Sequence, residues 1–251
     1  MTAPQQSNDA AQEVGAFAQS TCRALDGDDD RRNYHSYQHS LIAPQCGSAL
    51  LEIGAGTGAL SARFHNAQRR VVTDVDPEAV AYLEQRFAGR PDVEVRQLNL
   101  LAGEALDRPV DSAIAVNVLE HLEDDAGALR ALARSVRPGG SIVLFVPGYD
   151  QLYGDFDRKV GHVRRYTPAR LRRAVEQAGL TVTSCRPVNL IGGLAWWAAV
   201  RKGGTGSPRP RMVRLYDRLL VPLTRALERF WTPPFGQSIF CVARVPARDA
   251  G

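Results

Sequence analysis

The segment LLEIGAGTGAL, residues Leu50–Leu60, places three glycines at alternate positions directly after an apolar run. Glycine inside regular structure costs about 0.5–1 kcal/mol relative to alanine, so this density indicates that a ligand approaches the backbone closely. The apolar residues Ala49–Ile53 predict a strand that ends at the loop, and Thr57–Asn66 predicts a helix after it.

Segments with strand and helix character alternate along the rest of the chain. Further strands are expected at Arg70–Asp74, Val93–Leu98, Val110–Val116, Ser141–Val146, Thr181–Pro187 and Ser238–Val245. Helices are expected at Val14–Leu25, Tyr34–Ile42, Pro77–Phe87, Asp124–Val136 and Pro168–Ala178. This alternation is typical of βαβ units in a mostly parallel sheet, and strands apolar on both faces indicate helices on both sides. We therefore predict a doubly wound α/β fold.

The chain has 251 residues, of which 44% are hydrophobic, and no clear linker divides it. We expect one domain over residues 1–251, with a partly disordered N-terminal extension at 1–30 and a helical insertion at 188–234 before the last strand. A core of this size does not depend on disulfides. The four cysteines, Cys22, Cys46, Cys185 and Cys241, are far apart in sequence, which favours free thiols and a reducing cytoplasm.

The net charge of +4 is a mild excess without a basic stripe, so we do not expect nucleic-acid binding. The polar start of the chain does not resemble a signal peptide, and the apolar run Leu190–Val200 is shorter than the roughly 20 residues that span a bilayer. The region 188–234, which includes the amphipathic stretch Val213–Trp231, is expected to pack on the sheet, form a lid, contact a membrane surface peripherally or form a homodimer face.

An acidic residue, Asp74, ends the second predicted strand 20 residues after Gly54. A carboxylate at that place accepts hydrogen bonds from ribose hydroxyls. The spacing of Gly54, Gly56 and Gly58 is one residue shorter than a dinucleotide-binding GxGxxG motif. Glu52 would repel a pyrophosphate and attract an ammonium group. These features favour S-adenosylmethionine as the cofactor over NAD.

These residues resemble the class I, Rossmann-like S-adenosylmethionine-dependent methyltransferases. The matching segments are LLEIGAGTG (Leu50–Gly58), VVTDVDPEAV (Val71–Val80), RQLNLL (Arg96–Leu101), VNVLEHLEDD (Val116–Asp125) and RPGGSIVLFVP (Arg137–Pro147). The resemblance implies a seven-stranded sheet with a reversed last strand. It places Asp74 at the ribose and Asn117 with Val118 at the methionine end. Asn99 stands where many members carry an aspartate that faces the adenine amino group.

The glycine loop, the acid and the resemblance together define the expected cofactor site. Its residues are Tyr34, Glu52, Gly54, Ala55, Gly56, Gly58, Asp74, Val75, Asn99, Leu100, Asn117 and Val118. A narrower resemblance is to a bacterial subgroup often associated with family-2 glycosyltransferases. It is carried by LYGDFDRKVGHVRRYT (Leu152–Thr167), NLIGGLAWW (Asn189–Trp197) and PPFGQSIFCVARV (Pro233–Val245). It adds support for the architecture and little for the chemistry.

Methyl transfer to an alcohol needs alignment of the reactants and a proton acceptor, and histidine is the natural base. His162 is the first catalytic candidate and His121 the second. The expected acceptor-binding residues are Tyr37, Tyr153, Arg165, Tyr166 and Trp196; Arg164 is an alternative to Arg165 for an anionic acceptor. Asp124 and Asp125 are expected to cap a helix, so no metal site is predicted.

The function expected from the sequence is transfer of a methyl group from S-adenosylmethionine to an oxygen of a small-molecule acceptor. N- or C-methylation, also of a lipid-linked acceptor, remains open. So does a non-catalytic subunit that binds the same cofactor. An NAD-dependent oxidoreductase is disfavoured by the glycine spacing and by Glu52.

Overall fold

The computed structural model describes residues 31–201 and 210–247. The helix expected at Val14–Leu25 and the N-terminal extension expected at 1–30 both lie outside these ranges.

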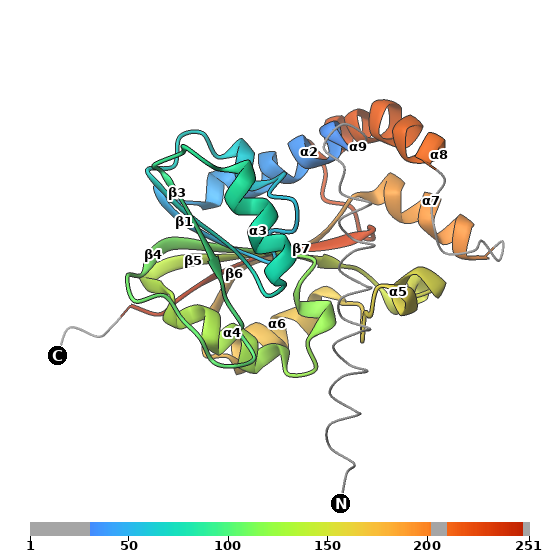
Figure 1. The fold of residues 1–251 in the computed structure, drawn as a ribbon. Helices are drawn as coiled ribbons and strands as arrows, with labels where there is room; N and C mark the ends of the chain where they lie inside the picture. Colours follow the sequence, from blue (N-terminus) through green and yellow to red (C-terminus); the bar gives the residue numbers. More distant parts are fainter. Residues whose placement is uncertain (1–30, 202–209, 248–251) are drawn as a thin grey trace, which may run out of the picture.

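One mixed sheet forms the centre of the molecule (Figure 1). Its strands are β1 (Ala49–Ile53), β2 (Arg69–Asp74), β3 (Val93–Gln97), β4 (Val110–Val116), β5 (Val136–Pro147), β6 (Thr181–Val188) and β7 (Ser238–Arg244). They lie in the order β3-β2-β1-β4-β5-β7-β6. The first five are parallel, and β7 runs antiparallel to both β5 and β6. The predicted seven-stranded sheet with a reversed last strand is therefore confirmed.

Alternate residues of each strand enter two apolar cores on opposite faces of the sheet. Leu51 and Ile53 of β1 pack in a cluster with buried residues of α4 (Asp125–Arg134) and α6 (Pro168–Gln177). Leu50 packs on the other face with residues of α2 (Arg32–Ile42). Figure 1 shows α4 and α6 on one side of the sheet and α2 on the other. The predicted helical layers on both faces are confirmed.

The helix predicted at Thr57–Asn66 is wrong. The segment contains turns and one 3-10 turn, Ser61–Arg63. Gly58 has φ +72°, a left-handed value that cannot continue a right-handed helix from Thr57. The next helix, α3 (Pro77–Arg86), begins where predicted, with Asp76 accepting a hydrogen bond from the Glu78 N–H as its N-cap.

The insertion at 188–234 is helical as predicted. It contains α7 (Leu190–Arg201), α8 (Pro210–Leu215), a π-helical turn (Tyr216–Leu220) and α9 (Val221–Glu228). Pro222 explains the π turn, because proline has no N–H and its ring clashes with the carbonyl four residues earlier. Within the described ranges, no helix combines the length and the apolar character needed to cross a bilayer.

Candidate functional site

The parallel strands bring several loops to one edge of the sheet. β1 pairs with β2 on one side and with β4 on the other, so the strand order reverses at β1. In open α/β sheets, ligands bind outside the carboxyl ends of the strands at such a point. The glycine loop after β1 lies at this position.

The glycine loop is held in a left-handed conformation by its neighbours. Gly54, Gly56 and Gly58 have φ of +65°, +55° and +72°. The Ala55 N–H donates to the Thr73 carbonyl over 2.9 Å, which ties the loop to β2. A Cβ added to Gly54 would lie 2.7 Å from Cγ2 of Val118, so the loops after β1 and β4 are in close contact there.

Asp74 connects the ends of β1 and β2. Its Oδ2 accepts the Gly56 N–H over 2.9 Å, and its Oδ1 accepts the Asp76 N–H over 3.0 Å. Burial raises the pKa of the Asp74 carboxyl, against the lowering effect of these backbone bonds. Each carboxylate oxygen has a second lone pair, so the group keeps acceptor capacity for ligand hydroxyls.

Glu52 is buried near the end of β1, and its carboxylate accepts a hydrogen bond from the Ser61 hydroxyl. The glycine loop therefore folds back over Glu52, and the turn at Ser61–Arg63 supplies the contact. The sequence did not single out Ser61, because nothing local marks a serine that will bond nine residues back.

Apolar and amide side chains border the ends of β2 and β3. Val75 is exposed immediately after β2. The Asn99 Oδ1 accepts the Leu101 N–H over 2.9 Å, which fixes the turn after β3. Leu100 is buried in the main core, whereas Leu101 is 62% exposed, so Leu101 is the neighbour that a ligand would meet.

The loop after β4 lies beside both the glycine loop and the end of β5. Asn117 is exposed with φ +53°, and its N–H donates to the Phe145 carbonyl over 2.8 Å. The Tyr34 ring of α2 meets the Phe145 ring edge-on, with centroids 6.5 Å apart. Tyr34 therefore lies over the carboxyl end of β5.

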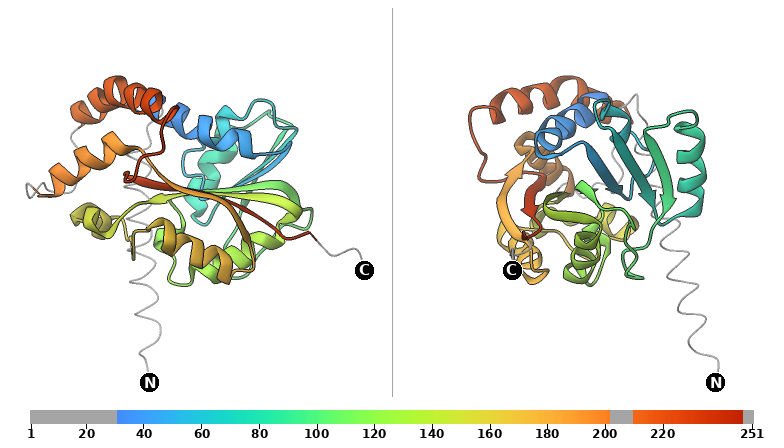
Figure 2. Two further views of the ribbon diagram at one scale, coloured as in Figure 1. Left: turned by 180° about the vertical axis from the view of Figure 1, so that it is seen from behind. Right: turned by 90° about the vertical axis from the view of Figure 1, so that its left-hand side faces the viewer.

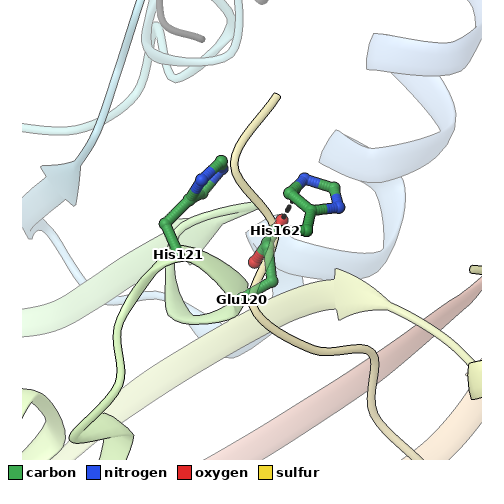
Figure 3. A group of neighbouring side chains, drawn as sticks. All are labelled: Glu120, His121 and His162. Atoms are coloured by element: carbon green, nitrogen blue, oxygen red, sulfur yellow. Dashed lines mark ion pairs between the residues drawn. The ribbon is translucent and has the colours of Figure 1, made fainter. Parts of the chain in front are cut away.

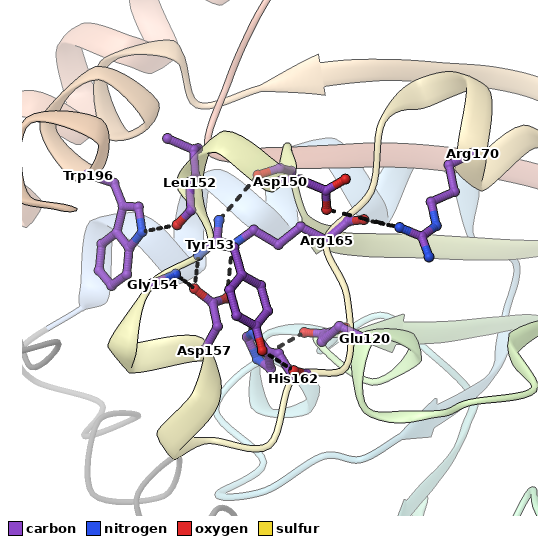
Figure 4. A network of polar contacts seen from close by, with 11 residues as sticks. Glu120, Asp150, Leu152, Tyr153, Gly154, Asp157, His162, Arg165, Arg170 and Trp196 are labelled. Carbon is purple, nitrogen blue, oxygen red and sulfur yellow. Dashed lines mark hydrogen bonds and ion pairs between the residues drawn. The ribbon is translucent and has the colours of Figure 1, made fainter. Parts of the chain in front are cut away.

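A second group of polar side chains gathers in the loop after β5 around Asp157 of α5 (Asp155–Lys159) (Figure 4). The Asp157 carboxylate receives Arg165 Nε over 2.8 Å, Arg165 Nη2 over 3.0 Å and the Gly154 N–H over 2.9 Å. It lies 2.7 Å from His162 Nδ1. Burial acts to raise the pKa of Asp157, but the bonds from His162 and Arg165 outweigh burial and hold the pKa below its ordinary value.

Glu120, His121 and His162 lie together where the loops after β4 and β5 meet (Figure 3). The two imidazole rings are 4.8 Å apart, and His162 Nε2 is 3.7 Å from Glu120 Oε1. Burial raises the pKa of Glu120 to about 8, whereas burial and the neighbouring His162 lower the pKa of His121 to about 4. At neutral pH, Glu120 is mostly protonated and His121 is neutral.

Comparison with known proteins adds independent evidence. Residues 51–142 match the family model described as a methyltransferase domain. The chain is 31% identical over 175 residues to a protein of Methylobacterium sp. named "Ubiquinone biosynthesis O-methyltransferase", covering 63% of this chain and 70% of that protein. The chain belongs to the S-adenosylmethionine-dependent methyltransferases.

Further similarities show how much of the chain and of its relatives is matched. A Mycolicibacterium smegmatis protein named "Probable S-adenosylmethionine-dependent methyltransferase" is 32% identical over 180 residues, covering 68% of this chain and 66% of that protein. Two Mycobacterium tuberculosis relatives are covered over 44% of their length, so the chain spans less than two thirds of the first curated relatives. The geranyl diphosphate C-methyltransferase of Streptomyces coelicolor shares the fold, with TM-score 0.59 at 12% identity, covering 84% and 79% of the two chains.

Most of the residues expected to bind the cofactor lie at one edge of the sheet, where β1, β2 and β4 have their carboxyl ends. They are the glycine loop, Asp74, Val75, Asn117 and Val118. The Leu100 side chain packs in the main core, so it is unsuited to the predicted cofactor contact.

Two tyrosines that were expected to bind the acceptor are buried and hydrogen-bonded inside the methyltransferase. Tyr37 is 2% exposed; its hydroxyl donates to the Glu228 carboxylate and accepts the Asn189 N–H over 3.2 Å. Tyr166 is fully buried and donates to Asp125 Oδ2 over 2.8 Å. These positions correct the expectation that both tyrosines face an acceptor.

The two arginines expected to hold an anionic acceptor have internal partners. Arg165 is buried against Asp157, and Arg164 Nη1 donates to Asp125 Oδ2 over 3.0 Å. The segment Arg164–Tyr166 therefore anchors the loop after β5. Of the two predicted caps, Asp124 is confirmed, since its Oδ1 accepts the Gly127 N–H at the start of α4 over 2.7 Å, whereas Asp125 binds Arg164 and Tyr166.

Tyr153 and Trp196 remain half-buried beside this loop. The Tyr153 hydroxyl donates to the His162 carbonyl over 2.7 Å, and the Trp196 indole N–H donates to the Leu152 carbonyl over 3.0 Å. Both residues therefore support the segment that carries His162. Glu120 could not be singled out from the sequence, because only the fold brings its buried carboxyl beside two histidines.

Proposed function

We propose that this methyltransferase transfers a methyl group from S-adenosylmethionine to an oxygen of a small-molecule acceptor, within one domain. The observation that supports this most directly is the contact between Asp74 and the Gly56 N–H at the point where the strand order reverses. It places a carboxylate with spare acceptor capacity beside an exposed left-handed glycine, Gly54.

The residues at this edge fit a nucleoside with an amino-acid tail. Asp74 would accept the ribose hydroxyls, and the exposed Val75 and Leu101 offer apolar surface to a base. The Gly54 backbone and Asn117 would hold the amino-acid tail. Position 54 has to be glycine, because a side chain there would collide with Val118. When bound, S-adenosylmethionine supplies a methyl group already activated by its sulfonium.

His162 is the proposed proton acceptor. Its Nδ1 lies 2.7 Å from the Asp157 carboxylate, so the neutral ring carries its proton on Nδ1 and presents a lone pair at Nε2. His162 Nε2 would take the proton of the acceptor hydroxyl as that oxygen receives the methyl group. Neutral Glu120 and neutral His121 beside the ring do not compete as fixed charges.

The test measures S-adenosylhomocysteine release over a panel of hydroxyl, carboxyl, amine and thiol acceptors. We expect Asp74→Ala to abolish cofactor binding in calorimetry, and His162→Asn to keep binding but lower kcat on hydroxyl acceptors by about 10²–10⁴-fold. Asp107→Asn, which removes a 98% exposed carboxylate, is the control and should leave both unchanged.

Other outcomes of this assay identify the alternatives. Turnover on amines alone would replace O-methylation by N-methylation, and a new carbon–methyl bond in the product would indicate C-methylation. Tight cofactor binding with no turnover on any acceptor would support a non-catalytic subunit. Unchanged cofactor affinity in Asp74→Ala would contradict the proposed site itself.

We also infer a reducing cytoplasm for this protein. Cys185 and Cys241 are directly opposite each other on β6 and β7, and a reducing compartment would keep this pair as free thiols. An oxidising compartment would favour joining such a pair. The association with family-2 glycosyltransferases stays a prediction that rests on the sequence of residues 152–167, 189–197 and 233–245.

A further inference from the structure

The helix that runs from α8 to α9 presents a continuous apolar stripe to solvent. Side chains spaced three or four residues apart share one side of a helix. Six large apolar side chains follow that spacing and are between 49% and 86% exposed: Met212, Leu215, Leu219, Leu223, Leu227 and Phe230. Figures 1 and 2 show this helix at the periphery of the molecule in every view. We call these six residues the outer stripe.

The charges on the same helix are divided between its two sides. The exposed charged residues of this helix are all basic, and they also follow helical spacing. They are Arg211, Arg214, Arg218, Arg225 and Arg229. The two acidic residues turn inward. Asp217 is buried and accepts the backbone N–H groups of Asn33 and Tyr34 at the start of α2, over 3.0 and 2.8 Å. Glu228 accepts bonds from the Tyr37 hydroxyl and the Leu190 N–H.

The inner contacts fix which side of the helix faces out. Asp217 and Glu228 clamp it to α2 and to the start of α7, while Val221 and Thr224 are buried beneath it. The helix therefore cannot rotate to hide the outer stripe without breaking these bonds. An exposed apolar row bordered by cations, with no exposed acid, is a preformed interfacial helix.

We propose that the outer stripe and its arginine border dock on the surface of an anionic lipid membrane. Leucine, methionine and phenylalanine side chains would enter the region between headgroups and acyl chains, and the arginines would contact lipid phosphates. A second copy of the chain fits less well, because a two-fold contact through this face would bring two sets of five arginines together.

The docking face is connected to the proposed acceptor region. Trp196 of α7 bonds the Leu152 carbonyl and meets the Phe156 ring edge-on, with centroids 5.3 Å apart. On the same helix, Leu194 and Trp197 are exposed. If the proposed function holds, membrane docking would bring the loop that carries His162 toward amphiphilic or lipid-linked acceptors. This last step rests on the proposed function, whereas docking itself does not.

The test is flotation of the full-length protein with phosphatidylcholine vesicles, with and without phosphatidylglycerol. We expect binding to the anionic vesicles that weakens with salt. The double variant Leu219→Glu/Leu223→Glu should reduce it by about tenfold or more, because carboxylates replace inserted side chains. Arg218→Gln/Arg225→Gln should weaken binding to anionic vesicles only. The control Tyr82→Glu changes a 46% exposed aromatic residue on α3 and should bind as wild type.

Two results would overturn the proposal. One is wild-type protein that fails to float with either vesicle. The other is a homodimer in light scattering that Leu219→Glu/Leu223→Glu dissociates, with vesicle binding unchanged by that variant. Matched thermal unfolding of the variants shows that they fold, which is expected because the mutated side chains are exposed. Flotation needs no turnover, so its failure is distinct from failure of the proposed reaction.

Discussion

The two halves of the proposed site are built in different ways. On the cofactor side, backbone groups do most of the work: glycines with positive φ, and amide N–H groups that meet the Asp74 carboxylate. On the acceptor side, long polar side chains bind one another, with Asp157 joining Arg165 to His162. A loop shaped by its backbone can therefore be predicted from the spacing of its glycines. A loop held by side-chain pairs cannot be predicted in this way, because the side chains that could bind a ligand already bind one another.

The largest expected effect is at Asp157. Replacing it by alanine leaves the buried Arg165 guanidinium without its partner, and breaking a buried ion pair typically costs about 3–5 kcal/mol of unfolding free energy. The matched control on the same helix is Asp155→Ala. Asp155 pairs with Arg158 at the surface, where such pairs contribute roughly 0–1 kcal/mol.

Denaturant unfolding of both variants measures the difference. Equal losses of stability in Asp157→Ala and Asp155→Ala would show that the acceptor loop is not organised around the buried pair. A stable Asp157→Ala protein with lost turnover would instead assign Asp157 a role in orienting His162 alone.

The next effect tests the backbone side of the comparison. In Gly58→Ala, the new Cβ would lie 2.8 Å from both Leu83 and Phe87 of the α3 region, at a residue with φ +72°. Left-handed strain and overpacking together should cost roughly 2–4 kcal/mol of unfolding free energy. The control is Gly89→Ala, which has φ +76° but no atom within 4 Å of the new Cβ.

Gly89→Ala should therefore show only the strain, about 1–2 kcal/mol. The difference between the two variants in thermal or denaturant unfolding isolates the close packing under the glycine loop. Identical losses would mean that the loop can shift away from α3, and that Gly58 is needed for its φ alone.

The same contrast explains what the sequence could and could not predict. The strand limits at Ala49–Ile53 and Val110–Val116 were predicted to the residue, since apolar runs bounded by glycine or polar residues are local signals. The helix at Thr57–Asn66 was wrong because left-handed glycines override the helical pattern after them. Arg165, Tyr166 and Tyr37 were assigned to an acceptor because their chemistry suits one. Their partners, Asp157, Asp125 and Glu228, are apparent only once the chain folds.

A smaller effect concerns the pH dependence of stability at Glu120. Its pKa rises from an ordinary 4.5 to about 8 on folding, so the folded state binds a proton that the unfolded state releases above pH 4.5. Stability is therefore lost as pH rises toward 8. Between pH 6.5 and 8, the loss should be roughly 1–2 kcal/mol, and Glu120→Gln should remove it.

His121 acts in a different pH window. Its pKa is lowered from 6.5 to about 4, so its contribution is present above pH 6.5 and is lost as pH falls toward 4. Thermal unfolding measured only between pH 6.5 and 8 thus reports on Glu120. The exposed Glu84→Gln on α3 is the control for removing a carboxyl group. A wild-type slope retained in Glu120→Gln would contradict the buried, protonated state of this residue.

The smallest expected effect is that of metal removal, for which we predict no change. Glu120, His121 and His162 offer ligand atoms that all lie within 4.8 Å of one another, and no other such group occurs among residues 31–201 and 210–247. Zinc bonds near 2.1 Å would place tetrahedral ligands about 3.4 Å apart, so the group would have to contract around an ion. A protonated Glu120 beside a neutral His121 carries no charge that an ion would have to balance. Prolonged treatment with a chelator should leave turnover and cofactor affinity unaltered, with elemental analysis of the purified protein as the control.

The opposite result would be a loss of turnover that one divalent cation restores in the wild type but not in Glu120→Gln. It would make His162 a metal ligand in place of a base. The acceptor side would then be organised by an ion, and its contrast with the backbone-built cofactor side would be larger still.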